Sequence, residues 1–110
     1  MKPVSVGINP TAGVTTTVYT VPTGYYALFN LLYIHNTGGS SKHITVQWYD
    51  ASTATTIDIL TQVTYSSKAY TQFDNAYIVF EEGDQLRLAP EAASAFSVVA
   101  TFEEIGLTRQ

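Results

Sequence analysis

The sequence predicts an all-β protein, a single antiparallel β-sandwich of about eight strands. Strand-forming residues dominate, since 45% of the 110 residues are hydrophobic and 13% are aromatic. Gly, Pro, Asn and Ser interrupt the apolar segments about every ten residues, which is typical of short strands joined by turns. The length fits one ordinary domain and leaves no room for a second.

Apolar and β-branched residues place the individual strands. Residues 1–13 are rich in Pro, Gly and Asn and are expected to form an amino-terminal arm, followed by the sandwich domain over residues 14–110. Residues 90–95 are expected to form a loop, because one helical turn of this length does not stand alone. The clearest strands are expected at 14–21, 25–36, 42–50, 55–61, 76–81, 85–89 and 97–104, with weaker ones near 4–8 and within 63–73.

Three turns are indicated by their residue chemistry. Pro22 fixes φ and Gly24 accepts a positive φ, so the chain bends sharply at 21–24. Residues 81–84 (EEGD) lie between two apolar segments, the pattern of a tight hairpin. Residues 36–41 (NTGGSS) join two long strands and are expected to close a third reversal, a hairpin centred near Gly39.

The hairpin near Gly39 predicts which side chains share a face. One face is expected to be core and holds Tyr26, Leu28, Leu32, Ile34, Ile44, Val46 and Trp48. The opposite face of 25–34 is also apolar, where a half-exposed strand usually alternates with polar residues. Residues 76–80 show the same lack of alternation.

A strand that is apolar on both faces needs a second covering layer, because so small a domain cannot enclose it by itself. We therefore predict a subunit interface on the second face of 25–34. The alternative is that residues 63–73 or the amino-terminal arm cover this face within the chain. The candidate interface residues are Tyr25, Phe29, Leu31 and Tyr33.

Charge and composition exclude several classes of partner. Five Lys plus Arg against nine Asp plus Glu give a net charge of −4, and the basic residues do not cluster, so no nucleic-acid partner is expected. No apolar stretch approaches the length that crosses a bilayer, and no signal peptide follows the amino terminus, so no membrane partner is expected. Without cysteine there is no disulfide, thiolate nucleophile or cysteine-bound zinc.

Candidate catalytic and metal-binding residues are few. His35 and His43 face each other in the expected hairpin, but a metal site needs a third ligand, so two exposed polar residues are the favoured interpretation. No Gly-x-Ser-x-Gly elbow and no Gly-rich phosphate loop occur. The sequence therefore predicts no enzyme, no cofactor and no metal.

The carboxylates leave two alternatives open. Asp50, Asp58 and Asp74 have no spacing that fixes two carboxyls around a substrate, although a glycosidase pair can still assemble in space. Residues 81, 82 and 84 place three carboxylates on one turn, where calcium is an alternative to a merely solvated hairpin tip.

Eight tyrosines and one tryptophan indicate a binding function, because flat aromatic faces stack on sugar rings or anchor protein interfaces. Trp48 is assigned to the core. The tyrosines expected at the surface are Tyr19, Tyr25, Tyr33, Tyr49, Tyr65 and Tyr70.

Four ordered segments resemble small β-sandwich virion proteins of tailed bacteriophages. They are TVYTVPTG (17–24), NTG (36–38), EEGDQL (81–86) and VVATFEEI (98–105). The resemblance covers roughly residues 16–105 and implies a jelly-roll-like sandwich, a fold that trimeric jelly rolls of the tumour-necrosis-factor and complement type share. One departure is Tyr25-Tyr26 after the turn, where the phage proteins often carry a lysine.

The function implied by the resemblance is that of a head decoration or cement protein. Such proteins are non-enzymatic, often homotrimeric, and bridge the joints between major capsid subunits. The implied partners are further copies of the chain and the phage major capsid protein or another virion protein, and the implied location is the virion, after synthesis in the host bacterial cytoplasm. Two alternatives remain: a tail, collar or fibre-associated structural protein, and a carbohydrate-binding β-sandwich module.

Overall fold

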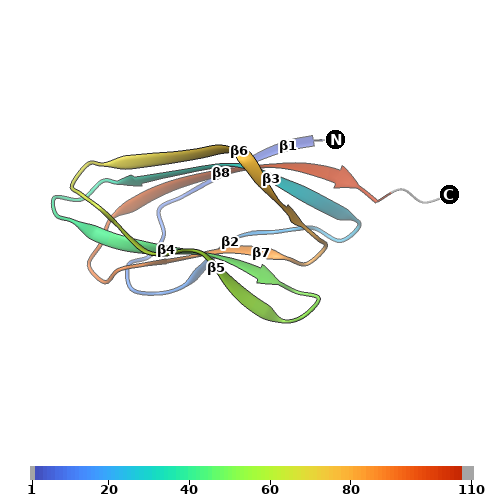
Figure 1. Ribbon diagram of the computed structural model, residues 1–110, viewed down its shortest axis with the longest axis horizontal. Coiled ribbons are helices and arrows are strands. Elements are labelled where there is room, and N and C mark those ends of the chain that lie inside the picture. Colours follow the sequence, from blue (N-terminus) through green and yellow to red (C-terminus); the bar gives the residue numbers. More distant parts are fainter. Residues whose placement is uncertain (1, 108–110) are drawn as a thin grey trace.

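Two four-stranded antiparallel sheets pack face to face and form the whole described fold (Figure 1). The computed structural model describes residues 2–107, except for the side chains of residues 75–77. β1 begins and β8 ends at the same end of the sandwich (Figure 1). The strands are β1 (Lys2–Ile8), β2 (Thr16–Thr20), β3 (Tyr25–Asn36), β4 (Lys42–Asp50), β5 (Thr55–Tyr65), β6 (Tyr70–Phe80), β7 (Gln85–Pro90) and β8 (Phe96–Gly106).

The strand order is that of a jelly roll. Sheet A has the order β1-β8-β3-β6, and sheet B has the order β2-β7-β4-β5. The first strand pairs with the last, the second with the seventh, the third with the sixth and the fourth with the fifth, as if one long hairpin had been rolled up. This confirms the predicted all-β sandwich. Within the described residues, no helix is long and apolar enough to cross a membrane.

Three sequence-based assignments are corrected by this topology. β3 and β4 lie in different sheets, so residues 37–41 cross between the layers and do not close a hairpin. Residues 81–84 form a turn in which Asp84 N–H donates to the Glu81 carbonyl at 2.9 Å, but they too link strands of different sheets. The segment 55–65, expected to break near residue 62, is one strand with a bulge at Gln62, whose φ is 45°.

The first strand belongs to sheet A. Residues 2–8 of the expected arm pair along the whole of β1 with β8, from Lys2 opposite Glu104 to Ile8 opposite Val98. Val4, Val6 and Ile8 are half-buried and pack against the core, which follows from their alternate positions in the strand.

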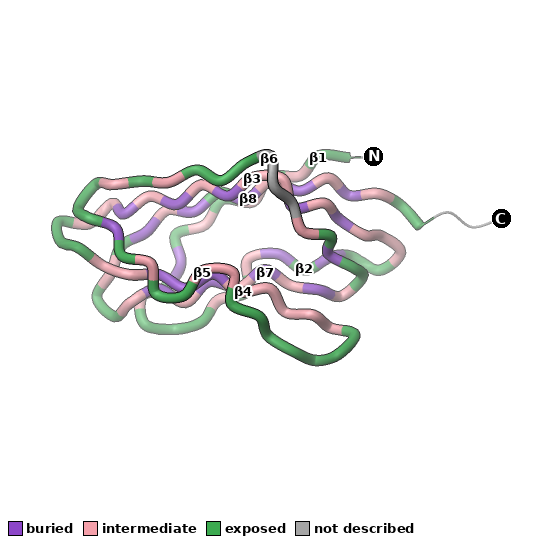
Figure 2. Tube along the Cα trace, viewed as in Figure 1, coloured by how far each residue is buried: buried purple, intermediate pink, exposed green. Residues whose placement is uncertain are grey.

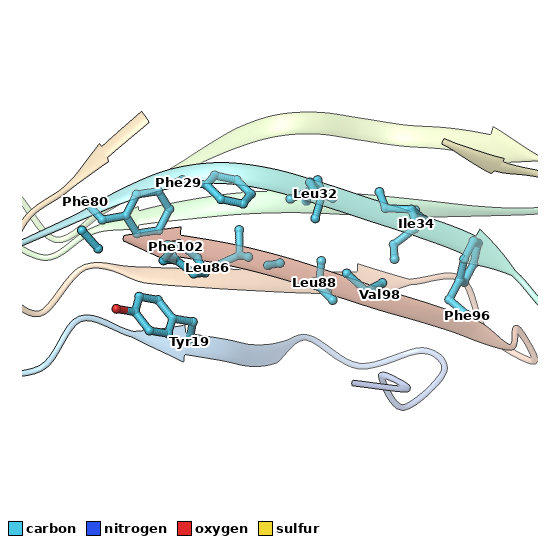
Figure 3. Close-up of a cluster of buried hydrophobic side chains, with 14 of the residues drawn as sticks. Tyr19, Phe29, Leu32, Ile34, Phe80, Leu86, Leu88, Phe96, Val98 and Phe102 are labelled. Carbon is cyan, nitrogen blue, oxygen red and sulfur yellow. The ribbon is translucent and has the colours of Figure 1, made fainter. Parts of the chain in front are cut away.

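The core lies between the sheets, and an aromatic cluster fills one part of it (Figure 3). Phe29 stacks on Phe102 with ring centroids 4.9 Å apart and meets the edge of Phe80 at 5.6 Å. Tyr19 stacks on the other side of Phe102 at 3.9 Å. Rings at these separations bury large apolar areas and add favourable ring–ring contacts.

Buried polar groups fasten the links at the two ends of the sandwich. Asn36 is fully buried, and its Nδ2 donates to the carbonyls of Ser40 and Tyr65 at 2.9 Å each, and to that of Ser66 at 3.2 Å. Its Oδ1 accepts from Gly38 N–H at 2.9 Å. One amide thus holds the β3–β4 link against the β5–β6 link, and supplies the backbone partners that these crossings need.

Asp84 performs the same task at the other end. It is fully buried, and its Oδ2 accepts from Trp48 Nε1 at 3.1 Å and Glu81 N–H at 2.9 Å. Its Oδ1 accepts from Ala51 N–H at 3.0 Å. Trp48 is half-buried and packs against the core, close to its predicted place. The carboxylate therefore fixes the β6–β7 turn to the β4–β5 hairpin, and hydrogen bonds to a charged acceptor are strong.

A buried hydrogen bond between two side chains also joins the two sheets. The Tyr19 hydroxyl donates to Glu104 Oε2 at 2.6 Å, and Lys2 Nζ lies 3.5 Å from Glu104 Oε1. Burial, together with the hydrogen bond to Glu104, raises the pKa of Tyr19 far above its usual value near 10. The phenol therefore stays protonated and serves as a structural donor.

Candidate interaction surface

The outer face of sheet A carries apolar side chains where a solvent-facing sheet is usually polar. Residues directly opposite in paired strands share a face, so the register fixes which side chains lie together. Val99 opposes Tyr33, and Val79 opposes Leu28. We call this surface the sheet A face; its apolar members are Tyr26, Leu28, Leu31, Tyr33, Tyr70, Val79, Val99 and Ile105.

Several members of the sheet A face are exposed to a degree unusual for large apolar residues. Tyr70 is 63% exposed and Val79 is 46% exposed. Tyr70 lies parallel to the half-buried Tyr33, with ring centroids 5.6 Å apart and an interplanar angle of 7°. The face therefore presents a stacked tyrosine pair beside aliphatic side chains.

The outer face of sheet B is polar by contrast. Gln85 Oε1 accepts from Arg87 Nε at 2.8 Å, and the Arg87 guanidinium lies 4.1 Å from the centre of the Tyr49 ring. Gln47 Nε2 donates to Asp58 Oδ1 at 3.1 Å. These side chains satisfy one another and face water at little cost, so the two outer faces of the sandwich differ in kind.

The four predicted interface residues fall into different environments. Tyr33 lies on the sheet A face, and Leu31 lies at its border with the groove described below. Tyr25 is half-buried and packs against the core. Phe29 is 6% exposed and belongs to the core, so its assignment to the interface is wrong. The interface itself stays a prediction.

A bulge in β3 explains the correction. The register of β3 shifts between Phe29 and Leu31 against both neighbouring strands. Against β8, Asn30 is an extra residue of β3 that reverses the alternation, whereas against β6 the extra residues belong to β6. Before the bulge the inward residues are odd-numbered, such as Ala27, and after it they are even-numbered, such as Ile34. Tyr26 and Leu28, predicted as core, therefore face outwards.

The predicted two-sided segment at 76–80 is tested only in part. The side chains of residues 76 and 77 lie outside the described residues. Phe80 is fully buried and Val79 is exposed, so this end of β6 alternates as an ordinary strand does.

An apolar groove opens between β5 of sheet B and β6 of sheet A. Its volume is about 210 Å³. Phe73 at the groove is 41% exposed, so the groove reaches the surface. Figure 2 shows β6 in the upper layer and β5 in the lower one, and most of the described residues of both strands are exposed or half-buried. The lining side chains are Phe29, Leu31, Leu32, Ile59, Leu60, Phe73 and Ile78.

Two pairs of consecutive residues line this groove. In a regular strand this does not occur, because neighbouring side chains point to opposite faces. Leu31 and Leu32 follow the β3 bulge, Ile59 is the extra residue at one register shift of β5, and Leu60 lies between that shift and the next. Bulges are known to re-aim side chains in this way. The sequence analysis did not predict this groove. The sequence signal that could have revealed it is two consecutive Leu or Ile residues at a point where the alternation of the strand breaks.

The candidate metal ligands are separated or already bonded. His35 lies on sheet A and His43 on sheet B, because β3 and β4 do not pair. His43 Nε2 lies 3.7 Å from Glu91 Oε1, and the same oxygen accepts a hydrogen bond from the backbone N–H of His43 at 2.9 Å. Among the residues that the structure describes, no three His, Cys, Asp or Glu side chains gather as a metal site. Asp84, one of the three carboxylates considered for calcium, is taken up by its structural hydrogen bonds.

The tyrosines are less exposed than expected. Tyr19 and Tyr65 are buried in the core, and Tyr49 lies under Arg87 on sheet B. The tyrosines of the sheet A face are Tyr26, Tyr33 and Tyr70, whereas Tyr25 packs against the core.

Comparison with solved structures finds the same fold in structural proteins. A protein of the pilus-like endospore appendages of Bacillus superposes with a TM-score of 0.58 at 13% identity, covering 97% of this chain and 87% of that one. A protein from the viral particle of infectious bursal disease virus gives 0.58 at 9% identity, covering 96% of this chain and 31% of that one. A pentameric capsid protein from metagenomic phage sequences gives 0.50 at 17% identity, covering 93% of this chain and 62% of that one.

The chain shares its fold with capsid and pilus β-sandwich proteins. It spans about a third of the bursal disease virus protein and less than two thirds of the phage capsid protein. No family model and no curated protein sequence matches the chain. The endospore appendages are disulfide-linked pili, whereas this chain has no cysteine and cannot form a disulfide between its copies.

Proposed function

We propose that this chain is a non-enzymatic structural protein of a phage virion that associates with its own copies through the sheet A face. One observation carries the proposal: the outer face of sheet A carries large, partly exposed apolar side chains among polar ones such as Thr101 and Glu103, whereas the outer face of sheet B is mostly polar. Exposed apolar surface of this extent on a soluble domain marks a contact surface. The fold shared with capsid proteins supports a virion location.

The size of the sheet A face fits a contact between proteins. Four strands about 4.8 Å apart, 7 to 12 residues long at about 3.3 Å each, span roughly 650 Å². A standard interface buries about 800 Å² on each partner. The face therefore approaches the area that one partner buries in a standard contact.

Within the virion, we assign the chain to decoration or cement of the head. A rigid sandwich held by buried hydrogen bonds at both ends resists deformation, and repeated non-covalent contacts strengthen a shell without chemistry. The homotrimer and the contact with the major capsid protein follow from the resemblance to phage decoration proteins. A tail, collar or fibre component remains the alternative within the same class.

The test compares virions assembled with the chain, without it, and with the Tyr33→Lys variant. We expect the chain in purified heads by quantitative mass spectrometry, and we expect heads that lack it or carry Tyr33→Lys to release DNA at a lower temperature. Absence of the chain from purified virions would contradict the proposal. Its presence in isolated tails and not in heads would contradict the assignment to the head.

Carbohydrate binding is the second candidate, and one observation favours it. Tyr70 is 63% exposed and lies parallel to Tyr33, so its open ring face suits stacking on a sugar. Under this candidate, a glycan array gives a signal that Tyr70→Ala removes. A blank array with a folded protein contradicts it.

A further inference from the structure

We propose that the groove between β5 and β6 binds an extended segment of another polypeptide, in which apolar side chains alternate with Lys or Arg. This site lies on the side of the sandwich and is distinct from the centre of the sheet A face. The proposal goes beyond the function proposed above, since it holds whether or not copies of the chain associate.

Two open sheet edges border the groove. β6 is the last strand of sheet A and β5 is the last strand of sheet B. In the described part of the chain, the outer backbone edge of neither strand pairs with another strand. An added strand is a recurrent mode of peptide binding, in which main-chain hydrogen bonds supply affinity and pockets select alternate side chains.

The groove selects apolar side chains. All of its lining residues are apolar, and the Phe73 ring stands partly in solvent at its mouth. Ile57, two positions before Ile59 on the same strand, is 45% exposed and extends the apolar surface along β5. An extended segment places every second side chain on one face, which matches this row.

Charge complementarity selects the remaining positions of the segment. β5 and β6 carry Asp58 and Asp74 but no Lys, Arg or His. Asp58 is exposed and accepts hydrogen bonds from Gln47 and Thr61, which are neutral and leave its negative charge in place. On a strand added to the β5 edge, the side chains that point away from the groove lie on the outer face of sheet B, beside Asp58, which favours Lys or Arg over acidic residues at those positions.

The experiment selects binders from a library of random peptides about nine residues long, which is enough for one strand. The bait is the full chain, and two exposed positions supply matched variants: Phe73→Lys in the groove and Val14→Lys, 51% exposed, in the β1–β2 link. We expect enrichment of peptides that alternate apolar residues with Lys or Arg. By fluorescence anisotropy, Phe73→Lys should weaken the best peptide at least about tenfold, and Asp58→Asn should weaken it mainly at low salt. Val14→Lys should bind as the parent does.

Four results would overturn the proposal. They are the absence of enriched peptides, enrichment of acidic or non-alternating peptides, and equal binding by the parent and Phe73→Lys. The fourth is dissociation of an oligomer of the chain by Phe73→Lys, because the groove would then hold a second copy. Loss of association in Tyr33→Lys bears on the proposed function alone and leaves the groove intact.

Discussion

Removing the Asp84 carboxylate should destabilise the fold more than any other change on the β6–β7 turn. Asp84→Ala leaves the donors of Trp48, Ala51 and Glu81 without their acceptor in a partly buried place. Each hydrogen bond to a charged group contributes about 1.5–3 kcal/mol, but water reaches some of the freed donors, so we expect a total loss of about 3–4 kcal/mol. For a domain of this size that lowers Tm by about 12–16 °C.

The assay is urea unfolding followed by Trp48 fluorescence and far-UV circular dichroism, with thermal unfolding in parallel. Glu82→Ala is the matched control, because Glu82 is an exposed carboxylate on the same turn; its stability should stay within about 0.5 kcal/mol of the parent. Asp84→Asn keeps one acceptor oxygen and should fall between the two. If Asp84→Ala lowers the free energy of unfolding by less than about 1 kcal/mol, Asp84 does not hold the β6–β7 turn against the β4–β5 hairpin.

The remaining predictions concern the core, the opposite end and pH. Phe29→Ala should cost about 3–5 kcal/mol in urea unfolding, because it empties the site between Phe80 and Phe102; a small loss would place Phe29 outside the core. Asn36→Ala should cost about 2–4 kcal/mol, since it removes all four hydrogen bonds of the amide; parent-like unfolding would contradict its role. The pKa of Tyr19 is raised in the folded state, so its stabilisation is complete below pH 10 and is lost as pH rises above 10, by about 1.4 kcal/mol per unit. Tyr19→Phe should therefore lose stability less steeply than the parent above pH 10, and equal slopes would contradict the raised pKa.

The turns could be located from the sequence, but their partners could not. Gly and Asp chemistry correctly marked reversals at 36–41 and 81–84, yet both segments cross between sheets. A turn motif specifies local backbone geometry, whereas sheet membership depends on distant strands such as β8. That Asn36 and Asp84 are fully buried was not predicted, because each is a polar residue whose partners come from a distant link.

The apolar face was predicted correctly in kind and only partly in its members. Residues 25–34 are apolar on both sides, as the sequence indicated, but the bulge at Asn30 exchanges the two faces midway. A single sequence gives a weak signal for a bulge: one polar residue within an apolar strand. Phe29 was therefore assigned to the wrong face, while Tyr33, beyond the bulge, was placed outwards correctly.

The central claim is that the sheet A face joins copies of this chain. The molar mass of the protein in solution tests it most directly. Size exclusion with light scattering at two concentrations about tenfold apart measures it. We predict three times the 12.0 kDa of one chain, reduced to one chain in folded Tyr33→Lys and unchanged in Thr17→Lys on sheet B. A parent chain that is monomeric at both concentrations, or a Tyr33→Lys variant that keeps the parent's mass, would contradict the claim.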